Sequence, residues 1–502
     1  MNCVELKPGD ADPLDRIFHP EHLAIVGVSV QGRGFGSGIL MSLREIGFEG
    51  TMYPVNARGG EIAGMRIYKS VEEIPARIDF AVIAVPAGVV PDALEACRRK
   101  GAAGAEILSA GFSELGTPEG VALEETVRQI AGKGIRVIGP NCFGIYCPRS
   151  GLTLLPGPDL SRESGPVAFL AQSGGMAIDF SHIGKWMGVR FSKVVSFGNG
   201  ADLREVELLN YLGNDPETKV IATYTEGVKD GPAFCDALRR VTKKKPVIVH
   251  KGGLSEAGGR AVASHTASLG GNRVIWESVL RQCNAVQVTS LWELAQTSLA
   301  FSMLPERIYR GITVAGGGGA LGIAASDSAE AFGIQLPLLD PAITDAIMEI
   351  LPKPGSSARN PIDVANPYVP PHILKEVLLT AAKDDRVDLQ ILIQLLYHYK
   401  SMALFSGCPV KDVTPFRELA AAVGEVVAVT GKPVIVVTPN IKQGIESLDI
   451  EEMLREARAA FLSEGVPVFD DLEDALRAIN HISQYCARKE TLERKHSSSN
   501  SF

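Results

Sequence analysis

Short apolar runs rich in β-branched residues alternate with amphipathic stretches along the chain, a pattern typical of parallel α/β architecture. In the N-terminal part, this pattern predicts helices over Pro91–Lys100 and Glu119–Lys133. It predicts strands at Leu23–Val28, Thr51–Val55, Phe80–Val85, Ala105–Ala110 and Arg136–Pro140. We therefore expect a Rossmann-like domain over residues 1–150.

Two further series of strands follow the first. The second begins after the Gly/Pro-rich stretch Leu154–Pro166 and contains VAFLAQ, SKVVSF, KVIATYT, KPVIVH and AVQV. The third begins at Arg310 and contains GITVAGGGGALG, DLQILIQLL, KPVIVVTP and GVPVFDD. These series predict a second domain over 151–305 and a third over 306–487. The remaining stretch, 488–502, is charged and then Ser-rich, which predicts a disordered tail.

Composition narrows the class of protein. The chain is 45% hydrophobic and 22% charged with a net charge of −8, and no Lys/Arg run accompanies aromatic residues, so a nucleic-acid partner is not expected. No apolar run approaches the about 18 residues that span a membrane, and the N-terminus is too polar for a secretory signal. The eight cysteines include no CxxC pair, which favours reduced thiols and no metal site. We expect a soluble cytoplasmic protein.

The first glycine-rich loop, IVGVSVQGRGFGSGIL, connects a strand directly to a helix, so backbone N–H groups can face an anion such as a pyrophosphate. Its spacing is not a clean GxGxxG, because Gly27 is followed by Gly32, Gly34 and Gly36. The loop could bind a nucleotide or CoA, or it could be tight only for packing. After the second strand, Asn56 and Arg58 replace the acidic residue expected for NAD, which favours a ligand with an extra phosphate such as CoA.

Two further motifs follow strand ends. IGPNCFGIYCP places Asn141, a donor and an acceptor, where a thioester could lie; an ordinary inter-domain turn is the alternative. In FLAQSGGMAIDF, Ser173 is a good N-cap, and the following Gly174 and Gly175 let a large anion approach the helix start. A simple capped helix would not need both glycines, so this motif favours phosphate binding.

A histidine lies in the segment GRAVASHTASLGG, within Gly252–Gly271, which we predict to be a long functional loop. A lone histidine is more often structural. Here, however, neighbours with little bulk would leave the His265 ring accessible, and a neutral imidazole is a competent nucleophile. Glu226, at the end of a predicted strand, is a candidate partner for its other ring nitrogen.

Together these motifs resemble the nucleoside-diphosphate-forming acyl-CoA synthetases, relatives of succinyl-CoA synthetase, and among them the α-type subunit of ADP-forming acetyl-CoA synthetases. The resemblance runs from about Leu14 to Asp471, almost the whole chain. After the first glycine loop come, in family order, GPNCFGI, AQSGG, SFGNGADL, YTEGV, SHTASLGG and NPIDV. SHTASLGG in this order is quite specific, whereas any one glycine loop alone would be weak.

The resemblance implies an α/β chain of three domains: a Rossmann-like CoA-binding domain, a flavodoxin-like ligase domain with a phosphohistidine loop, and a second flavodoxin-like ligase domain. It implies an acid–thiol ligase that interconverts acyl-CoA, ADP and phosphate with a carboxylic acid, CoA and ATP. The intermediates would be an acyl phosphate and a phosphohistidine on His265. No ATP-grasp domain is expected in this sequence. An ATP-grasp β-type partner with ADP/ATP and Mg²⁺ is therefore implied, in a hetero-oligomer.

The family's functional residues carry over position by position. The residue implied to accept the phosphoryl group is His265, with Glu226 orienting it. Ser173, Gly174 and Gly175 would hold phosphate, and Gly198 and Asn199 would lie near the acyl group. The CoA site is implied to comprise Gly27, Ser29, Gly34, Gly36, Asn56, Arg58 and Asn141. One departure is Gly200, where relatives often carry a larger, frequently basic residue.

Three other interpretations remain open at this point. An NAD-dependent oxidoreductase would account for the first domain only. A relative that forms acyl or carbamoyl phosphate without an ATP step would use much of the same chemistry. A non-catalytic CoA- or acyl-CoA-binding protein would not need a carrier histidine.

Overall fold

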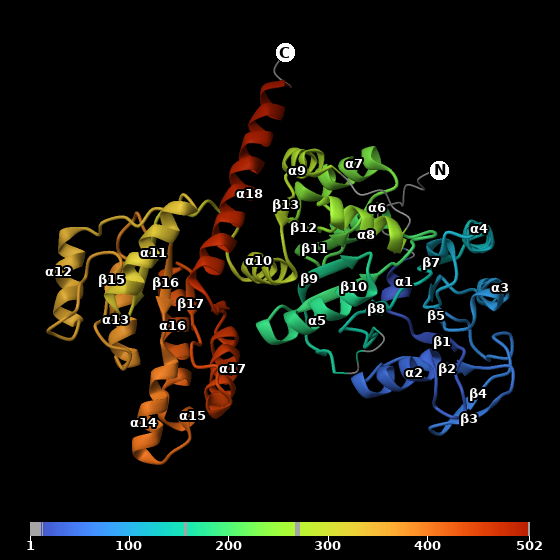
Figure 1. The fold of residues 1–502 in the computed structure, drawn as a ribbon, viewed down its shortest axis with the longest axis horizontal. Helices are drawn as coiled ribbons and strands as arrows, with labels where there is room; N and C mark the ends of the chain where they lie inside the picture. Colours follow the sequence, from blue (N-terminus) through green and yellow to red (C-terminus); the bar gives the residue numbers. More distant parts are fainter. Residues whose placement is uncertain (1–11, 13, 155–156, 158, 267–271, 500–502) are drawn as a thin grey trace. The chain divides into compact units, whose positions relative to one another are not determined.

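The computed structural model describes residues 12, 14–154, 157, 159–266 and 272–499, except for the side chains of 263–266 and 495–499. It contains three sheets of mainly parallel strands with helices packed on them (Figure 1). The α/β fold class predicted from the sequence is confirmed. The predicted domain bounds remain predictions.

The first sheet has the order β2-β1-β5-β6-β7, all parallel. Along β1, Leu23 and Ile25 enter one apolar cluster while Ala24 and Val26 enter another, as side chains that alternate between the two faces of a buried strand must. The strands are β1 (His22–Val26), β2 (Thr51–Val55), β5 (Phe80–Ile83), β6 (Gly104–Ile107) and β7 (Arg136–Ile138), with a hairpin of β3 (Gly60–Ile62) and β4 (Met65–Ile67). The helical segments are α1 (Asp15–Phe18), α2 (Phe35–Ile46), η1 (Ala87–Val89), α3 (Val90–Arg99), η2 (Ser113–Leu115) and α4 (Pro118–Ala131).

The second sheet has the order β13-β12-β11-β9-β10-β8, and its β8 edge strand is antiparallel to β10. The strands are β8 (Gly144–Tyr146), β9 (Ser164–Ala171), β10 (Phe191–Ser196), β11 (Val220–Thr225), β12 (Val247–Lys251) and β13 (Val286–Val288). The helices are α5 (Gly174–Met187), α6 (Glu205–Asn214), α7 (Gly231–Thr242), α8 (Glu256–Thr266) and α9 (Arg273–Gln282). One apolar cluster runs through both sheets, with Ile25 of β1 and Leu170 of β9 among its members.

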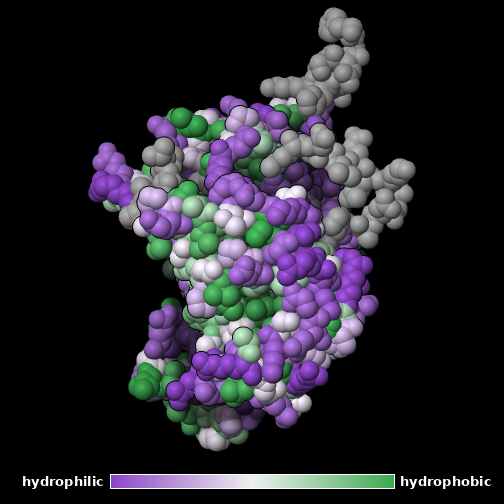
Figure 2. All heavy atoms as spheres, turned by 90° about the vertical axis from the view of Figure 1, so that its right-hand side faces the viewer, coloured by the Kyte–Doolittle hydropathy of each residue, from purple (hydrophilic) through white to green (hydrophobic). Residues whose placement is uncertain are grey.

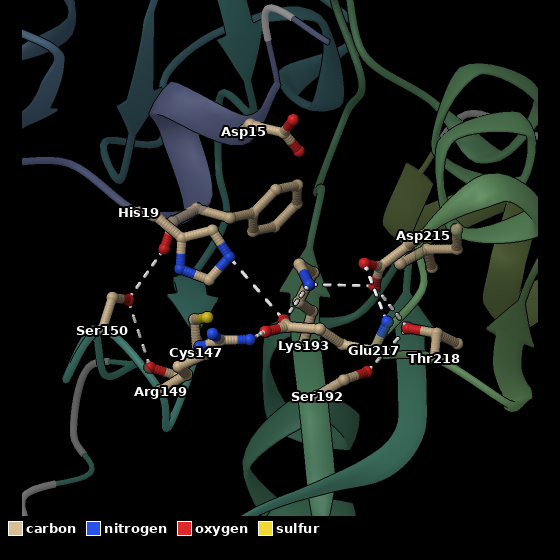
Figure 3. A network of polar contacts seen from close by, with 12 residues as sticks. Asp15, His19, Cys147, Arg149, Ser150, Ser192, Lys193, Asp215, Glu217 and Thr218 are labelled. Carbon is tan, nitrogen blue, oxygen red and sulfur yellow. Dashed lines mark hydrogen bonds and ion pairs between the residues drawn. The ribbon is translucent and has the colours of Figure 1, made fainter. Parts of the chain in front are cut away.

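A buried ionic network also joins these two sheets (Figure 3). Lys193 of β10 is fully buried, and its Nζ lies 2.9 Å from Asp215 Oδ2 and 2.6 Å from Glu217 Oε2. Burial lowers the pKa of Lys193, but the hydrogen bonds to the Glu217 and Asp215 carboxylates outweigh it and raise the pKa overall. Glu217 also pairs with Arg149 and lies 3.7 Å from His19 Nε2, which ties the α1 segment to the second sheet.

The third sheet has the parallel order β15-β14-β16-β17-β18. The strands are β14 (Ile312–Gly316), β15 (Ile362–Asp363), β16 (Leu389–Ile393), β17 (Val434–Val437) and β18 (Val468–Phe469). The helical segments are α10 (Leu291–Met303), α11 (Gly319–Ala331), α12 (Pro341–Ile350), α13 (Pro371–Ala381), η3 (Leu396–His398), α14 (Tyr399–Ser406), α15 (Val410–Val413), α16 (Phe416–Thr430), η4 (Ile445–Ser447), α17 (Leu448–Ser463) and α18 (Leu472–Ser499).

The chain divides into two compact units near Leu294. The first unit holds the first two sheets, and the second holds the third sheet with the short stretch Trp186–Gly188. Figure 2 shows one face of the molecule, on which hydrophilic residues surround smaller hydrophobic patches. Within the described ranges, no helix has both the length and the apolar character needed to cross a membrane.

Two segments differ from the sequence prediction. The stretch predicted as a long loop is helical over Glu256–Thr266, because Ser255 Oγ accepts the Gly258 N–H at 3.0 Å and so caps α8. At the C-terminus, α18 continues to Ser499, so the stretch predicted as a disordered tail is helical there. Pairs such as Arg494 with Glu490, one turn apart, support a charged helix that composition alone does not reveal.

Glu106 is a buried carboxyl group at the carboxyl end of the first sheet. It is 2% exposed, and its Oε2 accepts the Ile145 N–H at 3.0 Å. A Cβ at residue 144 would lie 2.4 Å from the same oxygen, so only glycine fits at Gly144. Burial raises the pKa of Glu106 to about 8.

We predict that Glu106→Gln removes a pH-dependent loss of stability. A carboxyl group whose pKa is raised in the folded state stabilises fully below its unfolded pKa and loses that contribution as pH rises through about 8. Relative to wild type, the variant should gain more than about 1 kcal/mol of unfolding free energy between about pH 5 and about pH 8. Urea unfolding at the two pH values measures this, and Glu61→Gln, at an exposed position, is the control. An equal difference between variant and wild type at both pH values would contradict the prediction.

Candidate functional site

All three sheets share one strand order. When the parallel strands are counted in chain order, each sheet reads 2-1-3-4-5, so the winding direction reverses between its first and third strands. In open parallel sheets, ligands bind outside the carboxyl ends of the strands at this switch point. The switch point lies between β1 and β5 in the first sheet and between β9 and β11 in the second.

The first glycine loop lies at the switch point of the first sheet. Gly27 has φ +106°, and a Cβ there would lie 2.2 Å from the Ala84 carbonyl oxygen, so no side chain fits. Gly36 in α2 lies against the loop as well, because its Cβ would lie 2.6 Å from the Gly27 carbonyl oxygen. Gly34 is the N-cap of α2, with φ +89° and no side-chain cap. The bare helix start can therefore receive an anion.

The other residues predicted for this ligand lie at the same sheet edge. The Ser29 N–H donates to Ser37 Oγ at 2.9 Å, which holds the loop on α2. Asn56 and Arg58 follow β2, where Asn56 Oδ1 accepts the Arg58 N–H at 3.0 Å. This turn leaves the Asn56 amide N–H groups and the exposed Arg58 guanidinium available to a ligand.

Gln172 joins the two strand ends at the second switch point. Its Oε1 accepts the N–H groups of Glu226 at 2.9 Å and of Gly227 at 3.2 Å. The helix α5 begins two residues after Gln172, and Ser173 Oγ accepts the Met176 N–H at 3.4 Å.

The start of α5 therefore lies beside the end of β11. Among the described residues, the N–H groups of Gly174 and Gly175 have no hydrogen-bond partner. They lie where the helix dipole favours a negative charge. The geometry suits a phosphate or phosphoryl group.

Glu226 is buried beside this helix start. The residue is 7% exposed, and Oε1 accepts the Tyr224 hydroxyl at 3.3 Å. Its Oε2 is buried and has no hydrogen-bond partner among the described residues. Leaving a buried acceptor unpaired is costly, so the arrangement calls for a donor that the described residues do not supply.

The GPNCFG segment lies against the start of α5. A Cβ on Gly174 would lie 2.8 Å from Cγ of Phe143, so the phenyl ring packs directly on this glycine. The Phe143 N–H donates to Ser196 Oγ of β10 at 3.1 Å. A loop of the first sheet is therefore fixed at the switch point of the second.

Asn141 and Asn199, both predicted from the sequence, meet at this place. Asn141 Nδ2 lies 3.4 Å from Asn199 Oδ1, and the Gly198 backbone passes so close that a Cβ there would lie 2.2 Å from the Asn141 carbonyl oxygen. Asn199 Nδ2 also donates to Glu114 Oε2 at 2.5 Å and to Glu124 Oε2 at 2.9 Å.

Neither of these carboxyl groups could be predicted from the sequence, because nothing in their local pattern marks them. Burial raises the pKa of Glu114, but the hydrogen bonds from the Gly111 N–H and Asn199 outweigh it and hold the pKa below its usual value. Glu114 and Glu124 thus fix the orientation of the Asn199 amide.

Gly200 has φ +61°, and a Cβ there would lie 2.7 Å from Arg204 Cγ. Arg204 fills that space, donates to the Asn199 carbonyl oxygen at 2.8 Å, and forms an ion pair of 3.3 Å with Glu205. A basic group therefore does lie beside the loop that contains Gly198 and Asn199, supplied by the N-cap residue of α6 instead of by position 200.

His265 falls in the last turn of α8, and its side chain lies outside the described residues. Lys251, at the end of β12, is a further residue of this place that the sequence did not single out; its Nζ donates to the Glu226 carbonyl oxygen at 2.8 Å. A lysine that ends a buried strand just before two glycines was a signal that could have been used. The described residues hold no group of three or more His, Cys, Asp or Glu side chains placed to bind a metal ion.

Comparison with known proteins agrees with this geometry. Residues 21–148 match the family described as CoA binding domain, and residues 164–301 match the succinyl-CoA ligase like flavodoxin domain. The chain is 34% identical over 481 residues to "Acetate--CoA ligase [ADP-forming] I subunit alpha" of Pyrococcus furiosus, covering 94% of this chain and 97% of that protein. The chain belongs to the ADP-forming acetate–CoA ligase family.

Other relatives define its place in that family. An ADP-forming acetate–CoA ligase of Archaeoglobus fulgidus is 33% identical over 94% of this chain, which spans 64% of that longer protein. A solved acetyl-coenzyme A synthetase 1 of Ca. Korarchaeum cryptofilum, in complex with phosphate and ADP, superposes with a TM-score of 0.81 at 30% identity. That match covers 96% of this chain and 98% of the solved one. The chain is an α-type subunit of an acyl-CoA ligase.

We predict that Gly36→Ala weakens CoA binding by at least about 10-fold, or about 1.4 kcal/mol. The added methyl group would meet the Gly27 carbonyl oxygen at 2.6 Å, and moving that backbone would displace the loop. Gly132→Ala at the end of α4 is the matched control, because its Cβ would lie 3.6 Å from its nearest neighbours, an ordinary contact. Calorimetric titration with CoA measures both variants, and equal affinities would contradict a CoA site at this loop.

Proposed function

We propose that this ligase subunit transfers a phosphoryl group from an acyl phosphate to His265 at the switch point of the second sheet. The observation that carries the proposal is the combination of two features: the N–H groups of Gly174 and Gly175 at the start of α5, and the buried Glu226 carboxyl group nearby. Neither these N–H groups nor Glu226 Oε2 has a hydrogen-bond partner among the described residues. The helix start is suited to the phosphoryl oxygens, and Glu226 is suited to accept the ring N–H of a histidine.

The first step forms the acyl phosphate. An oxygen of inorganic phosphate attacks the thioester carbonyl carbon of acyl-CoA, a C–O bond forms, and the C–S bond breaks. The CoA thiolate leaves and takes up a proton. Asn141 Nδ2 keeps one N–H beyond the one that faces Asn199 Oδ1, so it is suited to hold the reacting carbonyl group. Asn199, whose amide N–H groups donate to Glu114 and Glu124, would orient Asn141, and the N–H groups of Gly174 and Gly175 would hold the phosphate.

The second step moves the phosphoryl group to the protein. A ring nitrogen of His265 attacks the phosphorus, the P–O bond to the acyl group breaks, and the free carboxylate leaves. Glu226 would accept the N–H of the other ring nitrogen and stabilise the positive charge that develops on the ring. The α5 N-terminus would stabilise the charge on the transferring group.

The last step regenerates the histidine on a separate polypeptide. An oxygen of the terminal phosphate of ADP attacks the phosphohistidine, the P–N bond breaks, and ATP forms. We assign ADP/ATP and Mg²⁺ to an ATP-grasp β-type partner, because relatives of almost the same length as this chain are named as α subunits. The proposed assembly is a hetero-oligomer in the cytoplasm.

We predict that incubation with radiolabelled acetyl phosphate gives the chain an acid-labile label. His265→Ala should abolish the label and leave CoA affinity nearly unchanged, because the CoA loop belongs to the first sheet. Glu226→Gln should slow labelling by about 100-fold, the lower range for losing a positioned acid–base partner. Quench-flow labelling and calorimetry measure the two properties.

His182→Ala is the matched control. His182 is a partly exposed histidine of α5, and its Nδ1 lies 3.9 Å from Asp159 Oδ2. It should label at the wild-type rate. An unlabelled wild type would indicate a non-catalytic CoA-binding protein. If the chain is labelled but the ATP-grasp partner cannot transfer the label to ADP, the chain is a transferase without an ATP step.

A further inference from the structure

Lys251 is a buried cation that the mechanism above does not use. It is 4% exposed at the carboxyl end of β12, the neighbour of β11 in the second sheet. Its Nζ donates to the Glu226 carbonyl oxygen at 2.8 Å and also to the Gly252 carbonyl oxygen. The side chain therefore joins the end of one strand to the start of the segment that leads into α8.

The same ammonium group also contacts the far side of that segment. Lys251 Nζ lies 5.1 Å from the ring centroid of Trp276 in α9, a cation–π contact. Gly252 precedes His265 and Trp276 follows it, so one side chain contacts both ends of the histidine-bearing stretch. The same Nζ also contacts the backbone carbonyl oxygen of Glu226.

The electrostatic setting gives this cation a second role. Burial lowers the pKa of Lys251 to about 8, while the negative charge of Glu226 opposes that shift. The Tyr224 hydroxyl donates to Glu226, and the His250 ring lies 5.4 Å from the Tyr224 ring. The charge of Lys251 therefore lies within electrostatic range of the Glu226 side chain, the proposed partner of the histidine.

We propose that Lys251 is a positioning residue for phosphoryl transfer. It fixes the position of Glu226 relative to Gly252 and Trp276, which lie on either side of His265 in the sequence. The inference rests on the proposed function. It predicts that transfer requires the ammonium form, because neutral Lys251 loses its positive charge, one of its donors and much of its attraction to the Trp276 ring.

The test is the rate of histidine labelling by radiolabelled acetyl phosphate across neutral and alkaline pH. In wild type the rate should fall as pH rises through about 8, as Lys251 loses its proton. Lys251→Met should lower the labelling rate at neutral pH by about 10- to 100-fold, the loss typical when a hydrogen-bonding partner of a metal-binding residue is removed. It should also remove the fall at alkaline pH. Lys251→Arg should retain most of the rate and move the fall to higher pH, because a guanidinium stays protonated.

Lys245→Met is the matched control. Lys245 precedes β12, at its opposite end, and its Nζ likewise donates to two backbone carbonyl oxygens, those of Leu212 and Asp215, each at 2.6 Å. Burial also lowers its pKa. This variant should lose stability but keep the wild-type rate and pH profile.

Each outcome decides the question. A Lys251→Met chain with the wild-type rate and alkaline fall overturns the inference, as does an equal loss in Lys245→Met. If Lys251→Met does not fold, Lys251→Arg decides, and an unchanged alkaline fall in that variant overturns the inference. A wild-type chain that takes up no label overturns the proposed function itself, whereas a labelled wild type with unaffected Lys251 variants overturns only the role of Lys251.

Discussion

A buried acceptor without a donor is the constraint on which the candidate site depends. Glu226 is held by its backbone, through Gln172 and Lys251, where its carboxyl group points into the protein with one oxygen unpaired among the described residues. Folding alone gains nothing from that arrangement, since a carboxyl group in water would be fully hydrogen-bonded. A donor would offset that cost, and under the proposed function this donor is the imidazole N–H of His265.

The doubly wound strand order explains why the remaining groups converge there. Parallel strands bring their carboxyl ends to one edge, and the switch point opens a crevice between the loops on either side. Glycines then decide how closely backbones approach. Gly27 and Gly198 each pass a carbonyl oxygen within a distance that no Cβ would tolerate, and Gly174 lies directly against Phe143. At these positions the absence of a side chain lets the backbone segments approach closely and leaves backbone N–H groups accessible to a ligand.

Strand positions and the main motifs could be predicted from the sequence, because buried parallel strands give short apolar runs and their ends carry Gly, Ser and Asn. Contacts between segments distant in sequence could not be predicted. Glu114 and Glu124 meet Asn199 only through packing, and Lys251 resembles an ordinary strand-end lysine until its acceptors are known. The sequence of Glu256–Thr266 predicts a loop because its small residues permit both loop and helix; the segment is helical, and the Ser255 side chain caps it.

The central claim is that the start of α5 and Glu226 together form a site for a phosphoryl group beside a histidine. The most direct measurement is a crystal structure of the chain soaked in inorganic phosphate. We expect a phosphate bound by the N–H groups of Gly174 and Gly175, with a ring nitrogen of His265 hydrogen-bonded to Glu226. An empty helix start, with Glu226 paired to a different side chain, would contradict it.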